Sequence, residues 1–237
     1  MVITIDEIER YIGLEVKDPY GRKVGRIVAV YSEVDGSVTG IELEVTEDAF
    51  TTVSAKRIQI TEDGELHIIP EWKAEALELI KQLDRAKKRA KALDDLYSRN
   101  EIPRHAYDEF KKRVEESLKA LKVKAREVKA KLRRRSHDLE DIVLQVERAM
   151  AAIRMSYLAG EITEKGYKAA IEALRQAKDK ASEEKEDIKK IKEKIEKLES
   201  GPAEILSSIR KTVSEPSAEK SEPSIPEAPI LVQVVEG

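Results

Sequence analysis

Between Trp72 and Leu198, apolar residues recur at alternating steps of three and four, and charged residues fill the positions between them. This spacing places each apolar set on one narrow stripe of a helix, as in a coiled coil. Such a stripe needs a partner helix, because it is too narrow to fill a globular core. Arg135 interrupts the second set at an expected core position. The three sets are Trp72, Ala76, Leu79, Leu83, Ala86, Ala90, Leu93 and Tyr97; Leu118, Leu121, Ala125, Val128, Leu132, Leu139, Ile142, Val146, Ala149 and Ile153; and Tyr167, Ala170, Leu174, Ala177, Ala181, Ile188, Ile191, Ile195 and Leu198.

Two similar connections divide this stretch. The sequence over residues 96–102 is echoed sixty residues later over residues 156–162, with Asn100 and Gly160 in the same slot. Asn and Gly are the residues that best accept the left-handed backbone that closes a helix. The echo therefore predicts two similar helical hairpins that share their middle helix.

Pro103 and Thr163 suit the start of the helices that follow, so we expect helices over about 71–99, 103–159 and 163–199. The middle helix would be about 80 Å long at a rise of about 1.5 Å per residue. The two flanking helices together are slightly longer, so each could cover one half of the middle helix. This favours a three-helix antiparallel coiled-coil rod within one chain. Pairing between chains, including swapped hairpins, stays open.

Residues 1–70 have the pattern of a small β domain. Turn signals at Asp18–Gly21, Asp35–Gly36 and Asp63–Gly64 separate short β-prone runs. These runs lie at Val24–Val30, Val38–Val45, Thr52–Ile60 and Leu66–Ile69. Short strands at this spacing are typical of a small closed or half-closed β barrel.

The end of the chain changes character after Glu199. Gly201-Pro202 is a helix stop signal, and residues 200–224 are rich in Pro, Ser and Glu, which predicts a disordered linker. Residues 225–237 end in a compact β-prone run, Pro229–Gly237. An exposed apolar strand needs something to pair with. We interpret it as a docking peptide that adds a strand to a partner's sheet; the alternative is a strand that folds back onto the chain's own β domain.

Composition supports a multidomain α+β chain, with a barrel, a rod and a tail. Charged residues make up 38% of the chain and aromatic residues 4%, too polar for one large globular core. The absence of cysteine excludes disulfides and thiolate metal sites and fits a reducing, intracellular location. We expect no signal peptide, because the N-terminus turns acidic at Asp6, and no apolar run approaches the length of a membrane span.

The expected middle helix carries the main charge asymmetry. Twelve Lys or Arg residues lie between Lys111 and Arg135 against three Glu. One interpretation is a site for nucleic acid or an anionic membrane surface. The other, which we favour, is a solvated face partly neutralised by acidic residues of a neighbouring helix, because no aromatic or glycine residues interleave with the charges. The densest part comprises Lys129, Lys131, Arg133, Arg134 and Arg135.

Nothing in the sequence predicts catalysis or a cofactor. No phosphate loop, metalloprotease motif or nucleophile elbow occurs. His67, His105 and His137 lie too far apart in sequence to suggest a metal site. Tyrosines recur at the expected hairpin tips, where packing across the turns explains them. We therefore expect a protein that is not an enzyme, without cofactor or metal.

The N-terminal residues resemble a PRC-barrel domain. In that family a first strand with the pattern G-x-x-V-x-D and a glycine turn lead into K-V-G-x-V; here Tyr11–Asp18 and Gly21–Ile27 match, with Ile27 in the last position. The resemblance covers residues 1–70 and implies an interaction or adaptor module. Gly25 is then expected at a close backbone approach or a bulge.

The order of barrel, coiled coil and short apolar tail resembles the CdvA family of archaeal cell-division proteins over nearly the whole chain. The resemblance implies self-association into dimers or filaments at the mid-cell division site, in the cytoplasm and peripheral to the membrane. It also implies recruitment of the ESCRT-III-like protein CdvB, whose C-terminal winged-helix-like region would bind the tail peptide by strand addition. Links to DNA and to the inner membrane surface come with the family. The docking residues would be Ile230, Leu231, Val232, Val234 and Val235.

Two other functions remain open. One is a DNA-associated coiled-coil structural protein that binds through the basic part of the middle helix, with the tail incidental. The other is a ribosome or RNA-processing adaptor, since PRC-barrel-like modules also occur there. The long rod and terminal peptide have no role in that second alternative.

Overall fold

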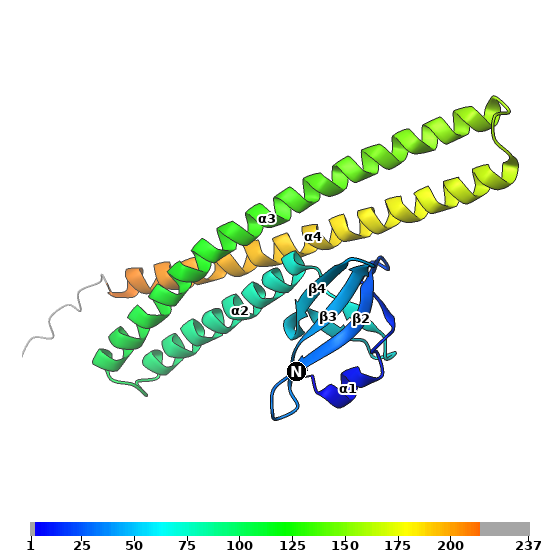
Figure 1. Ribbon diagram of the computed structural model, residues 1–237. Helices are drawn as coiled ribbons and strands as arrows, with labels where there is room; N and C mark the ends of the chain where they lie inside the picture. Colours follow the sequence, from blue (N-terminus) through cyan, green and yellow to red (C-terminus); the bar gives the residue numbers. More distant parts are fainter. Residues whose placement is uncertain (1–2, 214–237) are drawn as a thin grey trace, which may run out of the picture.

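The computed structural model describes the backbone of residues 3–213 and the side chains of residues 3–200. It contains a small β barrel and a long helical rod, and the barrel lies beside the rod near its middle (Figure 1). The predicted fold class is therefore confirmed for these two parts. The segment beyond residue 213, with the predicted linker and docking peptide, lies outside the described residues.

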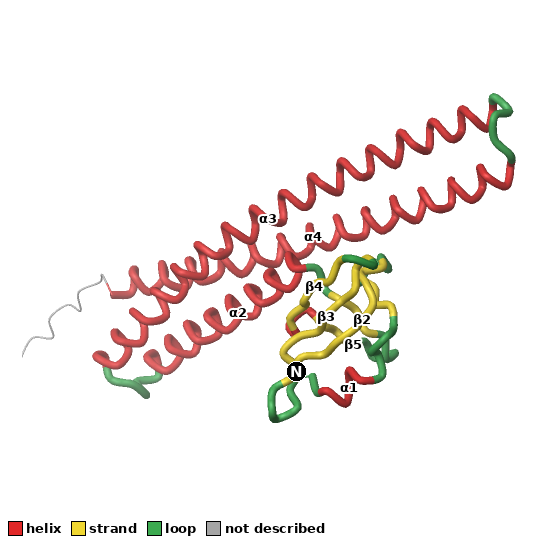
Figure 2. The backbone as a smooth tube through the Cα atoms, viewed as in Figure 1, coloured by secondary structure: helices red, strands yellow, loops and turns green. Residues whose placement is uncertain are grey.

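The barrel is built from six strands in the order β4-β3-β2-β1-β6-β5. Neighbouring strands pair antiparallel except β1 and β6, which are parallel. The 3-10 helix η1 joins the two outer strands β4 and β5, so the sheet is nearly closed (Figure 2). The elements are the helix α1 (Ile5–Glu9), β1 (Glu15–Lys17), β2 (Lys23–Ser32), β3 (Val38–Thr46), β4 (Ala49–Ser54), η1 (Ala55–Arg57), β5 (Ile58–Ile60) and β6 (Leu66–Ile68).

Two details of the barrel bear on the expectations. The β-prone run from Thr52 to Ile60 forms β4 and β5 with η1 between them, because the chain must leave one edge of the sheet to reach the other. Gly25 lies at a close backbone approach, as predicted: a Cβ atom there would be 2.7 Å from the carbonyl oxygen of Glu44 on β3. No larger residue fits at this crossing without a shift of the backbone.

The barrel has its own core. Its buried side chains come from α1 and from all six strands, so the sheet encloses apolar groups on its inner face. The core residues are Ile8, Tyr11, Val16, Ile27, Val38, Ile41, Leu43, Val53, Ile58, Leu66 and Ile68.

The rod consists of α2 (Glu71–Ser98), α3 (Arg104–Leu158) and α4 (Glu164–Val213). Each helix begins and ends within one residue of the bound expected from sequence, except at the end of α4. Figure 1 shows α3 and α4 running antiparallel along the whole rod, while α2 lies against them over one half. The shared core draws on all three helices: Ala76, Leu79, Ile80, Leu83, Ala125, Val128, Leu132, Leu139, Ala181, Ile188, Ile191 and Ile195.

The two turns between the helices have the predicted geometry. Asn100 and Gly160 both have positive φ, at 57° and 74°. At the first turn, the amide of Asn100 donates to the carbonyl of Tyr97, and the amide of Glu101 donates to that of Leu96. These two bonds form a Schellman motif, and the second turn repeats it.

The tyrosines at the turns pack across them, as the sequence indicates. The rings of Tyr97 and Tyr107 stack with centroids 4.2 Å apart, and those of Tyr157 and Tyr167 with centroids 4.5 Å apart. Each pair joins the end of one helix to the start of the next.

The end of α4 differs from the expectation. The helix continues past Gly201-Pro202 to Val213. A proline inside a helix removes one backbone hydrogen bond, and the following segment consists mainly of residues that tolerate helix. Even before this extension α4 lies against α2, since Trp72 contacts Glu184 and Lys73 pairs with Asp187. The helix therefore does not cover only the other half of α3.

Candidate interaction surfaces

The five basic residues singled out on α3 do not form one surface. Lys129 pairs with Glu199 on α4 at 2.6 Å, and Lys131 pairs with Glu75 on α2 at 2.7 Å. Arg135 pairs with Glu184 on α4 at 2.8 Å, where the rod contacts the barrel. Acidic residues of neighbouring helices therefore neutralise three of the five charges.

The remaining two basic residues, Arg133 and Arg134, are exposed. Within residues 3–200 neither belongs to an ion pair. Arg133 lines a groove between α3 and α4. Any electrostatic site on this part of α3 therefore depends chiefly on these two side chains.

Glu184 lies at the centre of the interface between barrel and rod. We call this interface the joint; its barrel residues are Tyr20, Gly21 and Arg22. Glu184 is completely buried on α4, and Arg135 binds it with both ends of the guanidinium group: Nε lies 2.8 Å from Oε1 and Nη2 lies 2.9 Å from Oε2. The indole of Trp72, at the start of α2, donates to Oε1 at 3.0 Å. Arg22, from the barrel, donates to Oε2. One carboxylate thus joins all three helices of the rod to the barrel.

The protonation state of Glu184 follows from these contacts. Burial alone would raise the pKa of its carboxyl, but the hydrogen bonds and charges of Arg135 and Arg22 outweigh burial and lower the pKa below its usual value. The charged form of Glu184 also raises the pKa of Arg135 through their hydrogen bonds. Both groups are therefore ionised at neutral pH, and the buried charge is fully paired.

The barrel contributes through the turn between β1 and β2. The carboxylate of Asp18 accepts hydrogen bonds from the amides of Tyr20 and Arg22, at 2.9 and 2.8 Å, and from Nε of Arg22 at 2.7 Å. Gly21 occupies the left-handed position of this turn with φ of 75°. The turn is thus held in a shape that directs Tyr20 and Arg22 to the rod.

Tyr20 makes the second part of the joint. Its hydroxyl donates to Oδ2 of Asp187 on α4 at 2.6 Å, and Lys73 of α2 binds the same oxygen at 2.7 Å. Burial and the bond to Asp187 raise the pKa of Tyr20 far above its usual value, so the phenol stays protonated and donates. Lys180 donates to the carbonyl of Gly21 at 3.0 Å. The barrel is therefore fixed to the rod by directional contacts at several points.

This joint was not predicted from the sequence, although two charged residues at core positions indicate it. Arg135 stands at a core position of α3, and Glu184 stands three residues after Ala181 and four before Ile188, a core position of α4. Opposite charges at core positions of two antiparallel helices suggest a buried pair. The role of Arg22 had no signal, because nothing in the sequence shows where the barrel turn lies.

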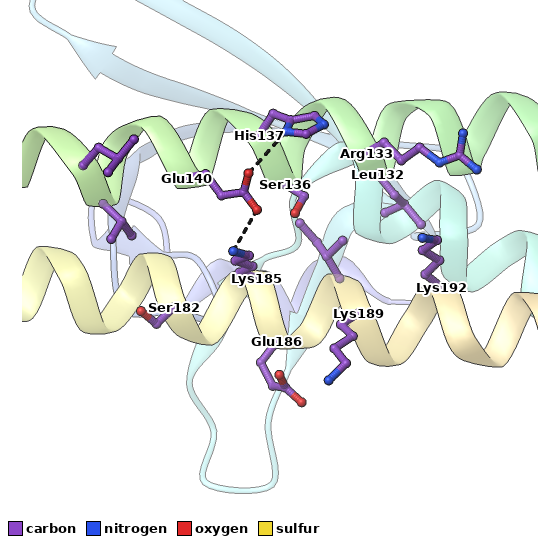
Figure 3. Close-up of a pocket in the computed structure, with 13 residues that line it drawn as sticks. Leu132, Arg133, Ser136, His137, Glu140, Ser182, Lys185, Glu186, Lys189 and Lys192 are labelled. Atoms are coloured by element: carbon purple, nitrogen blue, oxygen red, sulfur yellow. Dashed lines mark hydrogen bonds and ion pairs between the residues drawn. The ribbon is translucent and has the colours of Figure 1, made fainter.

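A groove opens between α3 and α4 beside the joint (Figure 3). Its volume is about 830 Å³, and the described residues that line it belong to α3 and α4. Arg133 and Lys192 lie at one end, while Lys185 bridges to Glu140, which in turn contacts His137. The groove combines an apolar floor with a rim that is mainly basic.

The predicted docking residues Ile230, Leu231, Val232, Val234 and Val235 lie outside the described residues, as does the rest of segment 225–237. Among residues 3–200, no group of three His, Cys, Asp or Glu side chains is placed to bind a metal ion. Across the same residues, no helix has both the length and the apolar character needed to cross a membrane.

Comparisons with known proteins agree with this architecture. The family model described as the CdvA-like coiled-coil domain matches residues 71–218, more than half of the chain. The chain is 36% identical over 237 residues to the protein named Cell division protein A from Sulfolobus acidocaldarius, and the match covers 99% of each chain. No solved structure matches the chain. A rod of this kind, a match to the family model across it and full-length similarity together show that the chain belongs to the CdvA family.

Proposed function

We propose that this protein is a cell-division scaffold that self-assembles and recruits an ESCRT-III-like protein through its C-terminal segment. The full-length similarity to a protein named Cell division protein A supports the role in division. The observation that carries the scaffolding part is the joint at Glu184, which holds the barrel at a fixed position on the rod. A rigid body of this shape can space and orient its binding elements.

The recruiting element is the segment with Ile230, Leu231, Val232, Val234 and Val235. Its apolar residues form a compact run rich in valine, a β-prone composition. Strand addition to a partner's sheet uses main-chain hydrogen bonds for affinity and alternate side chains for specificity. The winged-helix-like C-terminal region of CdvB is the proposed partner. Since α4 carries the chain to Val213 along the rod, the segment departs from the rod and not from the barrel.

Self-association into dimers or filaments would multiply this contact. The two-helix half of the rod leaves large apolar side chains in solvent, including Met155 and Leu158, which are 69% and 85% exposed. Contacts between copies would cover such groups. Many weak docking peptides on one polymer bind a polymeric partner far more tightly than one peptide does. In this proposal the assembly lies at mid-cell, on the inner membrane surface.

The test is isothermal titration of a synthetic peptide, residues 221–237, into the C-terminal region of the ESCRT-III-like partner. We expect saturable binding that is lost with Val232→Asp or Val234→Asp, because a charge cannot enter an apolar pocket without a large desolvation cost. Ser221→Asp adds the same charge outside the apolar run and should bind normally. Absence of binding by the unmodified peptide would refute the recruiting role.

A second candidate function is a structural protein that binds DNA through α3. The exposed side chains of Arg133 and Arg134 favour it, whereas the ion pairs of Lys129, Lys131 and Arg135 reduce the available charge. It requires affinity for DNA that falls steeply with salt. Replacing Arg133 and Arg134 by Gln should then abolish retention on DNA at low salt while peptide binding to the partner is unchanged.

A further inference from the structure

The groove between α3 and α4 is an open apolar surface that the proposed function leaves unused. Leu132 and Ile188 are buried at its floor, Val143 is half-buried, and Leu144 is 50% exposed. No residue of the barrel is among its described lining residues. The groove can therefore receive apolar side chains from another segment.

The rim of the groove is unevenly charged. Arg133 and Lys192 lie together at one end, and Lys189 lies nearby with the acidic Glu186 beside it (Figure 3). Among residues 3–200 none of these three basic residues forms an ion pair, whereas Lys185, further along the groove, is paired with Glu140 at 2.8 Å. The end that faces the C-terminal part of α4 is thus the basic end, and an acidic segment would bind there.

We propose that this groove holds the chain's own C-terminal segment, with the apolar run from Ile230 to Val235 on its floor and Glu222 and Glu227 against the basic end. In this state the segment is withheld from other proteins. That the withheld protein is the ESCRT-III-like partner rests on the proposed function; the docking itself does not.

The lengths of groove and segment agree. From Leu132 to Leu144 the groove follows twelve residues of α3, which is about 18 Å at about 1.5 Å per residue. The six residues from Ile230 to Val235 span about 20 Å when extended at about 3.3 Å per residue. The apolar run therefore matches the apolar floor from one end to the other.

The segment can also reach the groove of its own chain. Val213 lies 21 residues beyond Lys192 on α4, or about 32 Å along the helix. The sixteen residues from 214 to 229 can span up to about 50 Å at about 3.3 Å per residue. The connection is long enough to run back along the rod.

Charge favours this occupant. Residues 214–237 contain five Glu and a single basic residue, Lys220. A chain that returns from the end of α4 meets the basic end of the groove first, where Glu222 and Glu227 come before the apolar run. Opposite charges attract at this end, so we assign the groove to the acidic segment.

The test exploits the absence of cysteine in the chain. Full-length protein with Ser136→Cys in the groove and Gln233→Cys in the segment is oxidised with diamide, and the cross-linked species are separated on a non-reducing gel. We expect a cross-link within one chain. The matched control pairs Gln233→Cys with Ser98→Cys, an exposed residue at the far end of α2; it should form the cross-link at least fivefold more slowly, although the segment can reach it.

Charge reversal makes the test specific. Lys189→Glu together with Lys192→Glu should slow the Ser136→Cys cross-link at least fivefold, and adding Glu222→Lys and Glu227→Lys should restore it. Equal rates at the Ser98 and Ser136 positions, or no effect of charge reversal, would overturn the proposal. A cross-link between two chains whose rate depends on concentration would assign the groove to the segment of a second copy and would equally overturn it.

This experiment contains no partner protein, so its outcome is independent of the peptide titration. If the cross-link forms as expected and the peptide fails to bind the ESCRT-III-like protein, the docking in the groove stands and the proposed function fails. If the peptide binds the partner and the cross-link does not form, the proposed recruitment stands and the docking in the groove fails.

Discussion

Glu184 shows how one charged residue at a core position can connect two domains of one chain. A coiled-coil core position normally takes an apolar side chain, and a buried carboxylate is tolerated only when hydrogen bonds and opposite charges replace its hydration. Arg135, Arg22 and Trp72 supply these groups. A core of apolar residues would pack the helices equally well, but it would give the barrel no polar group to bind.

Glu184→Ala should destabilise the protein by about 2–3 kcal/mol, somewhat below the usual cost of breaking a buried ion pair. The expected loss of stability is smaller than usual because the side chains of Arg22 and Arg135 are each 31% exposed and can regain some hydration. Urea unfolding followed by circular dichroism measures the change. The control Glu183→Ala removes an exposed neighbouring carboxylate and should change the free energy of unfolding by less than about 0.5 kcal/mol. An equal effect of both substitutions would contradict the role of Glu184.

The lowered pKa of Glu184 gives a second prediction. Since the folded-state pKa lies below the ordinary value of 4.5, the unfolded chain takes up this proton more readily than the folded one. The stabilisation is therefore complete above the ordinary pKa and is lost as pH falls through the lowered pKa. The difference in free energy of unfolding between the natural protein and Glu184→Gln should stay constant from pH 7 to about pH 5 and shrink below that. A difference that grows on acidification would show that Glu184 is neutral in the folded protein.

Gly25 allows a test of the barrel alone. Gly25→Ala should lower the free energy of unfolding by about 1–3 kcal/mol, because overpacking forces the backbone to shift; the new Cβ would lie 2.7 Å from the carbonyl oxygen of Glu44. Gly166→Ala is the matched control. It lies in the first turn of α4, its nearest neighbour to an added Cβ is Thr163 Oγ1 at 3.5 Å, and alanine there should be neutral or stabilise by up to about 1 kcal/mol. Chemical denaturation of both variants decides the matter.

At the scale of elements, the two helical hairpins depend on their turns. Gly160 has φ of 74°, so Gly160→Ala should cost about 1–2 kcal/mol through the strain of left-handed backbone. Asn100→Gly introduces a residue that accepts the φ of 57° found there and should change stability by less than about 0.5 kcal/mol. Thermal unfolding should show a lower melting temperature for the first variant only. Similar losses in both would mean that the asparagine side chain itself holds the first turn.

The elements of the rod were predictable because their signals are local. Stripe periodicity and the residues Asn100 and Gly160 determine where helices lie and turn, and both are visible in the sequence. The extension of α4 was not predictable in this way, since Gly201-Pro202 usually ends a helix. The joint was also not predictable from the sequence, because Arg22, Arg135 and Glu184 come from segments far apart in the chain and only the fold brings them together.

At the scale of the whole molecule, the function of the joint is to make two domains one body. Contacts between domains are often small and polar and leave the domains free to move. Here the turn from Asp18 to Arg22 is shaped by its own hydrogen bonds and binds two separate acids of α4, Glu184 and Asp187. The same two acids bind side chains of α2 and α3. Two anchoring points fix an orientation, whereas one would leave a pivot.

The orientation should therefore be lost when both anchors are removed, with each domain still folded. Spin labels at Ser32→Cys on the barrel and Arg154→Cys on α3, both exposed positions, should give one narrow distance distribution by pulsed electron paramagnetic resonance. In the background Tyr20→Phe with Arg22→Ala this distribution should broaden, because the hydroxyl bound to Asp187 and the guanidinium bound to Glu184 are gone. A label pair within the rod, Arg154→Cys with Lys190→Cys, should keep its distribution in the same background. If the barrel-to-rod distribution stays narrow, packing alone holds the barrel; if the pair within the rod broadens as well, the joint maintains the helices and not the orientation of the domains.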